Sequence, residues 1–314
     1  MKTILVPAED HDSMAAVLEA ALLVARQFGS YVEGFAVRPA PSEFVALDPL
    51  SSLTMPQVVD DDAQIERDSR QMFESFMASN DVPPAPPPFP TPPPHPSLSP
   101  TPPSPASAGA SGKAAREGRE GVSYAWVRTG GQFDPFIGSY GRVFDLIVLG
   151  RPGRAPQNPR TAPLEAALFE SGRPVLIAPP TPPKQLGRNV LVAWNGSTEQ
   201  ARTNALAMPL LRGADEVTVL TVEGGMTANP TGDPCPTGDE VALHLIRNGV
   251  PATAVTVAPA GRTTGEAILD HARSRDYDLL VKGAYAQSRL RQMIFGGATR
   301  HILAYATLPV LMAH

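Results

Sequence analysis

Short apolar runs alternate along the chain with longer segments in which apolar residues recur at helical spacing. An apolar run of this kind is typical of a strand that is buried on both faces of a parallel sheet. In the first half of the chain, the expected strands are residues 3–8, 31–37, 122–128, 144–149 and 174–178. In the second half, they are residues 189–194, 216–222, 252–257, 278–282 and 308–312.

The segments between these strands predict amphipathic helices. In the first half they are residues 14–28, 57–79, 133–142 and 163–171. In the second half they are residues 198–211, 237–248, 264–274 and a last helix that begins at Gly296 and Gly297. The alternation of strand and helix predicts an α/β fold: an open parallel sheet with right-handed crossovers and helices on both faces.

The two halves of the chain repeat each other. KTILVPAED at 2–10 matches RNVLVAWNG at 188–196, and FDLIVLGRPG at 144–153 matches YDLLVKGAYA at 277–286. SGRPVLIAP at 171–179 matches ATLPVLMAH at 306–314. Matches in the same order predict two tandem domains of one design, residues 1–180 and 188–314.

The first domain is longer because it contains a Pro-rich insertion at about 81–121. Proline lacks an N–H donor and has a fixed φ, so this stretch is excluded from helices and from sheet ladders. We expect an extended or disordered spacer on the surface. A docking site for a proline-binding module is the alternative.

Charge and hydropathy narrow the class of protein. A net charge of −5 and a pI near 5.7 argue against a general nucleic-acid binder, which is usually basic. No apolar run approaches the roughly 20 residues of a membrane-spanning helix, and the start of the chain lacks the pattern of a signal peptide. We therefore expect a cytoplasmic protein without nucleic-acid or membrane partners. The single cysteine, Cys235, cannot form an internal disulfide.

The most informative stretch for function is the end of the chain, from 277 to 314. A buried strand ends there at Gly283, and Gly296 and Gly297 open a helix after a polar loop. In open parallel sheets, ligands lie beyond the carboxyl ends of the strands, where the strand order reverses. The unpaired N–H groups of a first helical turn favour a phosphate. The sequence therefore predicts an anion site built from this loop and from residues 194–197.

Motifs for catalysis are weak in this sequence. The six histidines lack metal-ligand spacing, and neither a G-x-S-x-G elbow nor a Walker motif occurs. Glu266 and Asp270 are interpreted as a solvated helix face, and His301 as a helix surface residue. We therefore expect a protein that is not an enzyme, with a hydrolase as the least favoured alternative.

With its repeat, the chain resembles a tandem universal stress protein, two such domains joined together. Nucleotide-binding members of that family carry Gly, two residues, Gly, nine residues, Gly and then Ser or Thr after the fourth strand. Gly283 and Gly296 match the first and third glycines, while Ala286 and Gly297 depart from the pattern. Asn195 stands where the family has an Asp after the first strand.

The resemblance implies the fold in more detail. Each domain is expected to be an open parallel sheet of strand order 3-2-1-4-5, of the adenine nucleotide alpha hydrolase-like type. The two domains would be related by a pseudo-twofold axis. Family members pair through the last strand, which implies either a homodimer or pairing of the two domains within this chain.

The resemblance also implies a stress-response regulatory protein that binds an adenine nucleotide, ATP or AMP, in the C-terminal domain. Mg²⁺ is expected only together with the nucleotide. The implied site residues are Trp194, Asn195, Gly196, Gly283, Ala286, Arg289, Gly296, Gly297, Ala298 and Thr299. The alternative is a universal stress protein that binds no nucleotide and acts as a dimerising scaffold or signalling module.

The first domain is predicted not to hold a nucleotide in this way. Gly150 and Gly153 match the first two glycines, but Pro163 stands near the start of the following helix. Glu9 and Asp10 add negative charge after the first strand. In the second domain, Lys282 at the end of a buried strand is interpreted either as a phosphate ligand or as a side chain that snorkels to solvent.

Overall fold

The computed structural model describes residues 1–38, 55–86, 121–127, 134–153, 157–225, 235–284 and 296–314. Within 55–62 it describes the backbone of a helix but no side chains. Most of the Pro-rich insertion lies outside these ranges. So do two predicted site residues, Ala286 and Arg289, and the loop 287–295.

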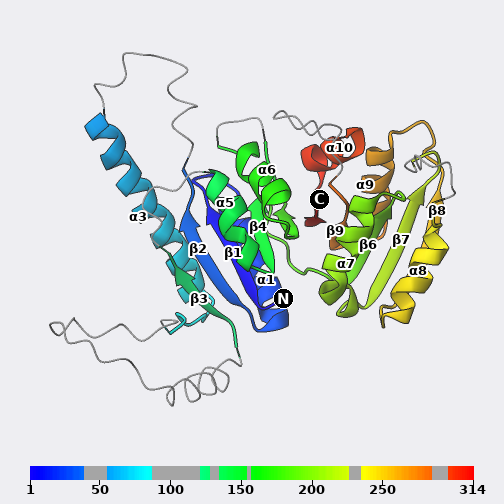
Figure 1. The fold of residues 1–314 in the computed structure, drawn as a ribbon, viewed down its shortest axis with the longest axis horizontal. Coiled ribbons are helices and arrows are strands. Elements are labelled where there is room, and N and C mark those ends of the chain that lie inside the picture. The colour runs from blue at the N-terminus through cyan, green and yellow to red at the C-terminus, as the bar shows by residue number, and fades with distance from the viewer. Residues whose placement is uncertain (39–54, 87–120, 128–133, 154–156, 226–234, 285–295) are drawn as a thin grey trace, which may run out of the picture.

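The described strands form a single sheet of ten strands with the order β3-β2-β1-β4-β5-β10-β9-β6-β7-β8 (Figure 1). The first half contributes β1 (Thr3–Ala8), β2 (Tyr31–Ala36), β3 (Ser123–Trp126), β4 (Leu146–Gly150) and β5 (Val175–Ala178). The second half contributes β6 (Asn189–Trp194), β7 (Glu216–Val222), β8 (Ala252–Val257), β9 (Leu279–Val281) and β10 (Val310–Met312). Each half has the order 3-2-1-4-5, which confirms the predicted fold class.

Both faces of the sheet are covered because the central strands are apolar on both sides. Ile4 and Val6 of β1 point into one core cluster, whereas Leu5 between them points into the other. One face carries α1 (Met14–Phe28), α3 (Met55–Ser79), α7 (Thr198–Arg212) and α8 (Gly238–Arg247). The other carries α5 (Asp134–Tyr140), α6 (Thr161–Glu170), α9 (Thr264–Ser274) and α10 (Gly297–Tyr305). This arrangement explains why the strands read as continuous apolar runs rather than as alternating ones.

A few predicted bounds need correction. The helix expected at 133–142 ends at Tyr140 and continues as a 3-10 turn, Gly141–Val143. The strand expected at 278–282 is shorter, because Asp278 and Lys282 flank β9 rather than belong to it. Local residues set two of the helix ends: Gly29 adopts the left-handed conformation that ends α1, and Thr237 forms a capping box with Glu240 at the start of α8.

The two halves of the sheet meet at β5 and β10, which are antiparallel, whereas the other strand pairs are parallel. The mirrored strand order and this antiparallel pair relate the halves by a pseudo-twofold axis. Side chains reinforce the junction. Arg151, just after β4, donates hydrogen bonds to the carbonyl oxygens of Leu303 and Ala304 in α10, and Phe169 of α6 lies edge-on to His314. The helix α10 is therefore held by both halves.

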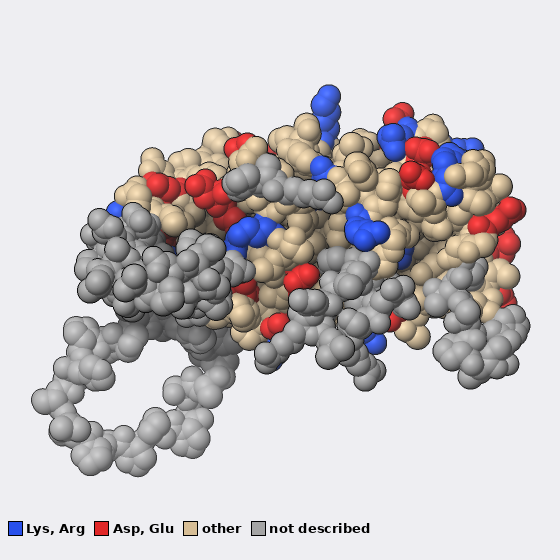
Figure 2. All heavy atoms as spheres, turned by 90° about the horizontal axis from the view of Figure 1, so that it is seen from above, with Lys and Arg blue, Asp and Glu red and all other residues tan. Residues whose placement is uncertain are grey.

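The described surface that faces the viewer in Figure 2 has a mixed distribution of charge. Viewed from above the orientation of Figure 1, basic and acidic side chains are interspersed over the visible described part, without a continuous basic area (Figure 2). Among the helices that the structure describes, none combines the length and apolar character needed to cross a bilayer.

Candidate functional site

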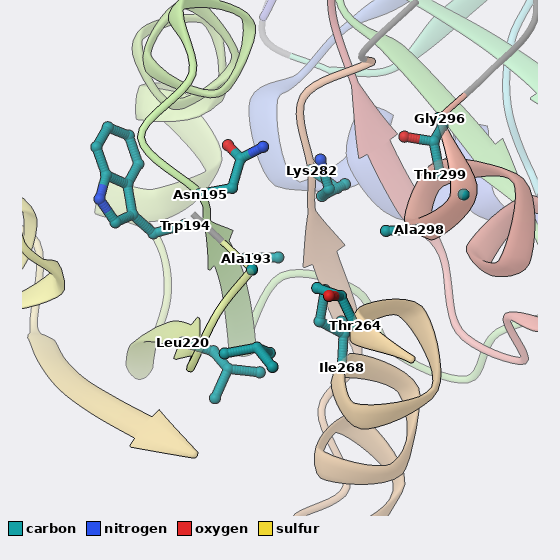
Figure 3. Close-up of a pocket in the computed structure, with 13 residues that line it drawn as sticks. Ala193, Trp194, Asn195, Leu220, Thr264, Ile268, Lys282, Gly296, Ala298 and Thr299 are labelled. Carbon is teal, nitrogen blue, oxygen red and sulfur yellow. The ribbon is translucent and has the colours of Figure 1, made fainter. Parts of the chain in front are cut away.

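A cavity of about 180 Å³ lies at the carboxyl ends of β6 and β9, beside the amino end of α10 (Figure 3). Six of the ten predicted site residues line it: Trp194, Asn195, Gly296, Gly297, Ala298 and Thr299. The other lining residues are Ala193, Leu220, Val222, Gly225, Thr264, Ile268 and Lys282. The cavity therefore joins polar groups from two strand ends and one helix end with an apolar wall from β7 and α9.

The turn after β6 shapes one side of the cavity. The Oδ1 atom of Asn195 accepts hydrogen bonds from the backbone N and from the Oγ of Ser197, at 3.2 and 2.9 Å, which is the geometry of an Asx turn. Gly196 has a φ of +78°, which an L side chain rarely adopts. Gly196 does not line the cavity, so its role in the site is to allow this turn.

Trp194 is anchored in the wall of the cavity. Its Nε1 donates a hydrogen bond to the carbonyl oxygen of Pro236 at 2.7 Å, and the residue is only 7% exposed. The indole belongs to the core cluster on the face that carries α7 and α8, opposite to Leu220 and Ile268, and in Figure 3 it points away from the cavity, so that only the backbone side of Trp194 borders it.

Gly283 has a packing role at the end of β9. Its N–H donates to Oε1 of Gln200 at 2.6 Å, and a Cβ at this position would lie 2.6 Å from the backbone N of Gln200. The glycine is needed because β9 ends directly against the start of α7. Gly283 does not line the cavity, although the sequence pattern placed it at a phosphate.

The amino end of α10 supplies hydrogen-bond donors. Gly296 is its N-cap residue and, as a glycine, has no side chain with which to cap the helix. The first intrahelical bond that includes Gly296 runs from the N–H of Arg300 to the Gly296 carbonyl oxygen, at 2.9 Å. The N–H groups of the first turn have no intrahelical acceptor, and the helix dipole adds a partial positive charge at this end.

Lys282 is the cavity residue whose importance was left open by the sequence. It is 3% exposed, and its Nζ donates to the carbonyl oxygen of Gly283 at 2.9 Å. The idea that it snorkels to solvent is therefore wrong. Burial lowers the pKa of Lys282 to about 8, while the nearby charge of Glu199 acts in the opposite direction. The available signal was a charged residue that directly follows an apolar run, LLVK.

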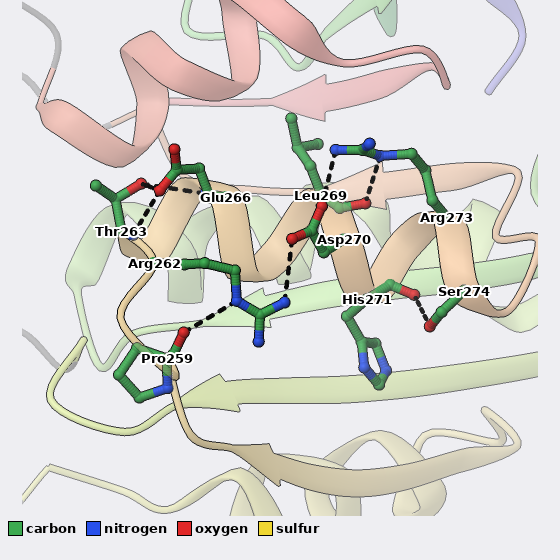
Figure 4. Close-up of polar contacts among 9 residues, drawn as sticks. All are labelled: Pro259, Arg262, Thr263, Glu266, Leu269, Asp270, His271, Arg273 and Ser274. Atoms are coloured by element: carbon green, nitrogen blue, oxygen red, sulfur yellow. Dashed lines mark hydrogen bonds and ion pairs between the residues drawn. The ribbon is translucent and has the colours of Figure 1, made fainter.

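The carboxylates on α9 have structural roles (Figure 4). Oε2 of Glu266 accepts hydrogen bonds from the N and Oγ1 of Thr263, at 2.7 and 2.9 Å, and the Glu266 N–H returns one to Oγ1 of Thr263. Asp270 forms ion pairs with Arg262 and Arg273 at 3.0 and 2.9 Å. The two acids therefore serve a capping box and a surface ion-pair cluster. Among the described residues, no three of His, Cys, Asp and Glu gather as metal ligands.

In the first half, the matching edge of the sheet is occupied by the protein's own side chains. Arg160, at the N-cap of α6, forms ion pairs with Glu9 after β1 and with Asp134 at the start of α5, at 2.8 and 2.7 Å. Both carboxylates are buried. A Cβ on Gly150 would lie 2.5 Å from Pro159, so this glycine accommodates a neighbouring side chain. The guanidinium thus lies where the second half leaves a cavity.

Comparisons with known proteins agree with this architecture. Residues 187–314 match the model of the universal stress protein family. No curated protein matches the chain. A solved universal stress protein from Archaeoglobus fulgidus DSM 4304 is 13% identical with a TM-score of 0.56, over 99% of this chain and 97% of that one. A functionally unknown protein from Pseudomonas aeruginosa PAO1 is 14% identical with a TM-score of 0.49, over 100% of this chain and 92% of that one.

At 13% identity, the likeness to the Archaeoglobus fulgidus structure concerns the fold alone. The family match adds the identity of the second half: residues 187–314 form a domain of the universal stress protein family. The first half repeats the fold of that domain in mirrored order within the same sheet.

Proposed function

We propose that the second half of this chain binds an adenine nucleotide, ATP or AMP, and that the protein regulates a stress response without catalysing a reaction. One observation carries this proposal. The end of β6, the end of β9 and the start of α10, whose N-cap is the glycine Gly296, converge on one cavity. The resemblance to nucleotide-binding universal stress proteins supplies the class of ligand.

The cavity suggests how the nucleotide would lie. Its phosphates fit the start of α10, with its N–H groups and Thr299, and its base fits the apolar side formed by Ala193, Leu220 and Ile268. The cavity volume of about 180 Å³ is below the roughly 300–1,000 Å³ of typical ligand sites, so a whole nucleotide would extend beyond it.

The described residues of the cavity provide few ligands for Mg²⁺ in the absence of a nucleotide. Asn195 contributes an amide where the family has a carboxylate, and among the described residues the lining of the cavity contains no acid. A hard cation prefers charged oxygen ligands. Mg²⁺ would therefore enter with the phosphates that carry the charge.

We also propose that the two halves take the place of a dimer. Both edges of β10 are paired, one with β9 and the other with β5. Pairing of two chains through this strand would require the internal pair to separate. The alternative function, a scaffold that binds no nucleotide, would use the same internal pair.

Titration calorimetry of the full chain with ATP and AMP tests the proposal. Gly297→Asp is a suitable variant because Gly297 is exposed and a Cβ there meets nothing within 4 Å. An aspartate in the first turn favours the helix but repels a phosphate. We expect at least about a tenfold loss of affinity, which corresponds to about 1.4 kcal/mol.

Thr161→Asp, at the exposed start of α6, is the matched control and should leave the affinity unchanged. Absence of binding heat, together with absence of adenine in the supernatant of the denatured protein, would favour the scaffold. If the wild type and Gly297→Asp bind ATP and AMP with equal affinity, the phosphates do not bind at the start of α10.

A further inference from the structure

Lys282 is the one charged side chain among the described residues that line the cavity. It is 3% exposed, yet among the described residues no carboxylate forms an ion pair with it. Its bond to the Gly283 carbonyl oxygen uses one of three N–H donors. A buried cation without a paired anion destabilises a fold, and an ammonium kept in such a place calls for another explanation.

The position of Lys282 supplies that explanation. Its backbone N–H donates to the carbonyl oxygen of Leu311, which fixes the residue between β10 and the end of β9. In Figure 3, the amine lies between the Asn195 side chain on one side and the start of α10, with Gly296 and Thr299, on the other. The two positive features of the cavity, the ammonium and the helix end, therefore border the same space.

We propose that Lys282 is the residue that makes this cavity select ligands with a phosphate group over the uncharged nucleoside. The proposal rests on the proposed nucleotide function, whose site it specifies. A phosphate between Lys282 and α10 accepts charge-assisted hydrogen bonds from Nζ and hydrogen bonds from the helix N–H groups. Adenosine alone leaves the buried ammonium without an anion and so gains nothing from it.

The same chemistry applies to a nucleotide and to a free polyphosphate. Both carry the anionic oxygens that the ammonium and the helix end recognise, but only the nucleotide gains from the apolar wall of Leu220 and Ile268. Affinities for ATP, AMP, adenosine and inorganic tripolyphosphate therefore separate the part of the ligand that each group recognises.

The test compares Lys282→Met with the wild type, using calorimetry of the full chain with these four ligands. Methionine keeps the length of the stem and removes the charge. We expect about a 10- to 100-fold weaker affinity for ATP, AMP and tripolyphosphate, since a hydrogen bond between charged groups has about this effect. The affinity for adenosine should change by less than about threefold. Lys184→Met removes the same charge from an exposed position and should change none of the four affinities.

Each outcome decides the question. If Lys282→Met binds ATP as tightly as the wild type, or loses ATP and adenosine equally, Lys282 does not select phosphate, although nucleotide binding stands. If the wild type binds tripolyphosphate through Lys282 but binds no nucleotide, the nucleotide function fails and phosphate selection stands. If the wild type binds none of the four ligands, both fail. If Lys282→Met has a melting temperature equal to or above that of the wild type, any loss of affinity is not caused by a loss of folded protein.

Discussion

Asp145 and Asp278 play the same part in the two halves of the sheet. The carboxylate of Asp278 accepts hydrogen bonds from the backbone N–H groups of Gly187, Arg188 and Asn189, at 2.8 to 3.2 Å. The carboxylate of Asp145 accepts them from Lys2 and Thr3, at 2.5 and 3.1 Å. In each half, an aspartate before the fourth strand therefore holds the start of the first strand. The aspartate shared by the repeated segments FDLIVLG and YDLLVKG therefore has a role in folding rather than in ligand binding.

Removal of one of these carboxylates should destabilise the fold. Asp278→Ala leaves several backbone donors without their acceptor, and a loss of about 2–4 kcal/mol in the free energy of unfolding is expected. Urea denaturation measures it. Asp215→Ala removes an acid from an exposed ion pair with Arg188 and should change stability by less than about 1 kcal/mol. Equal effects of the two substitutions would contradict the role assigned to Asp278.

Lys282→Met should stabilise the ligand-free protein, and the gain should depend on pH. The pKa of Lys282 in the fold is about 8, below its ordinary 10.5, so the unfolded chain binds more protons between these values. Wild-type stability therefore rises as the pH increases through this window, while the full penalty, about 3 kcal/mol, applies below pH 8.

The free energy of unfolding of Lys282→Met should therefore exceed that of the wild type most at pH 7 and least near pH 10. Urea denaturation at both pH values measures this difference. Glu199, whose charge opposes the shift, remains in both proteins. Lys184→Met, which removes the same charge from an exposed position, is the control. A variant less stable than the wild type at pH 7 would mean that the ammonium is already neutralised without ligand.

Arg160→Met should destabilise the first half in a pH-dependent manner. Burial raises the pKa of Glu9 to about 7, with Arg160 acting in the opposite direction. A raised carboxyl pKa means that the fold binds more protons than the unfolded chain, so its contribution to stability falls as the pH rises from about 4.5 to 7. Without Arg160, the buried Glu9 and Asp134 lose their cation.

The expected loss is about 3–5 kcal/mol at pH 7.5 and smaller at pH 5, where Glu9 is protonated and carries no charge. Chemical denaturation at the two pH values measures the difference. Arg188→Met, at an exposed ion pair, is the control and should cost less than about 1 kcal/mol at either pH. A loss independent of pH would show that packing, not charge, explains the effect.

Trp194 should report ligand binding by fluorescence. The chain has two tryptophans, so Trp126→Phe leaves Trp194 as the only one. The backbone of Trp194 lines the cavity while its indole packs on the other face of the sheet, so a nucleotide that fixes this strand end should change the indole emission with a dissociation constant equal to the calorimetric one. In Trp194→Phe, the remaining Trp126 should not respond. A response of Trp126 instead of Trp194 would place the ligand in the first half.

Local patterns in the sequence predicted local structure well. β1, β6, β7, β8 and α9 have the bounds that the apolar periodicity indicated. Thr237 and Glu240 form a capping box at the start of α8, and Thr263 and Glu266, with the same spacing, form another at the start of α9. Glu266 was interpreted as part of a solvated face, because spacing alone does not show which backbone N–H a carboxylate reaches.

The sequence by itself determined the order of strands and helices, the repeat and therefore the fold, because periodicity records which faces each element must bury. It also placed Trp194, Asn195 and residues 296–299 near one another, since strand ends and a helix start meet at one edge of such a sheet. Only the tertiary structure decided that Gly283 is required by Gln200, that Arg160 fills the matching edge of the first half and that Lys282 is buried in the cavity. These features depend on contacts between residues far apart in the chain, and such contacts exist only once the elements are packed.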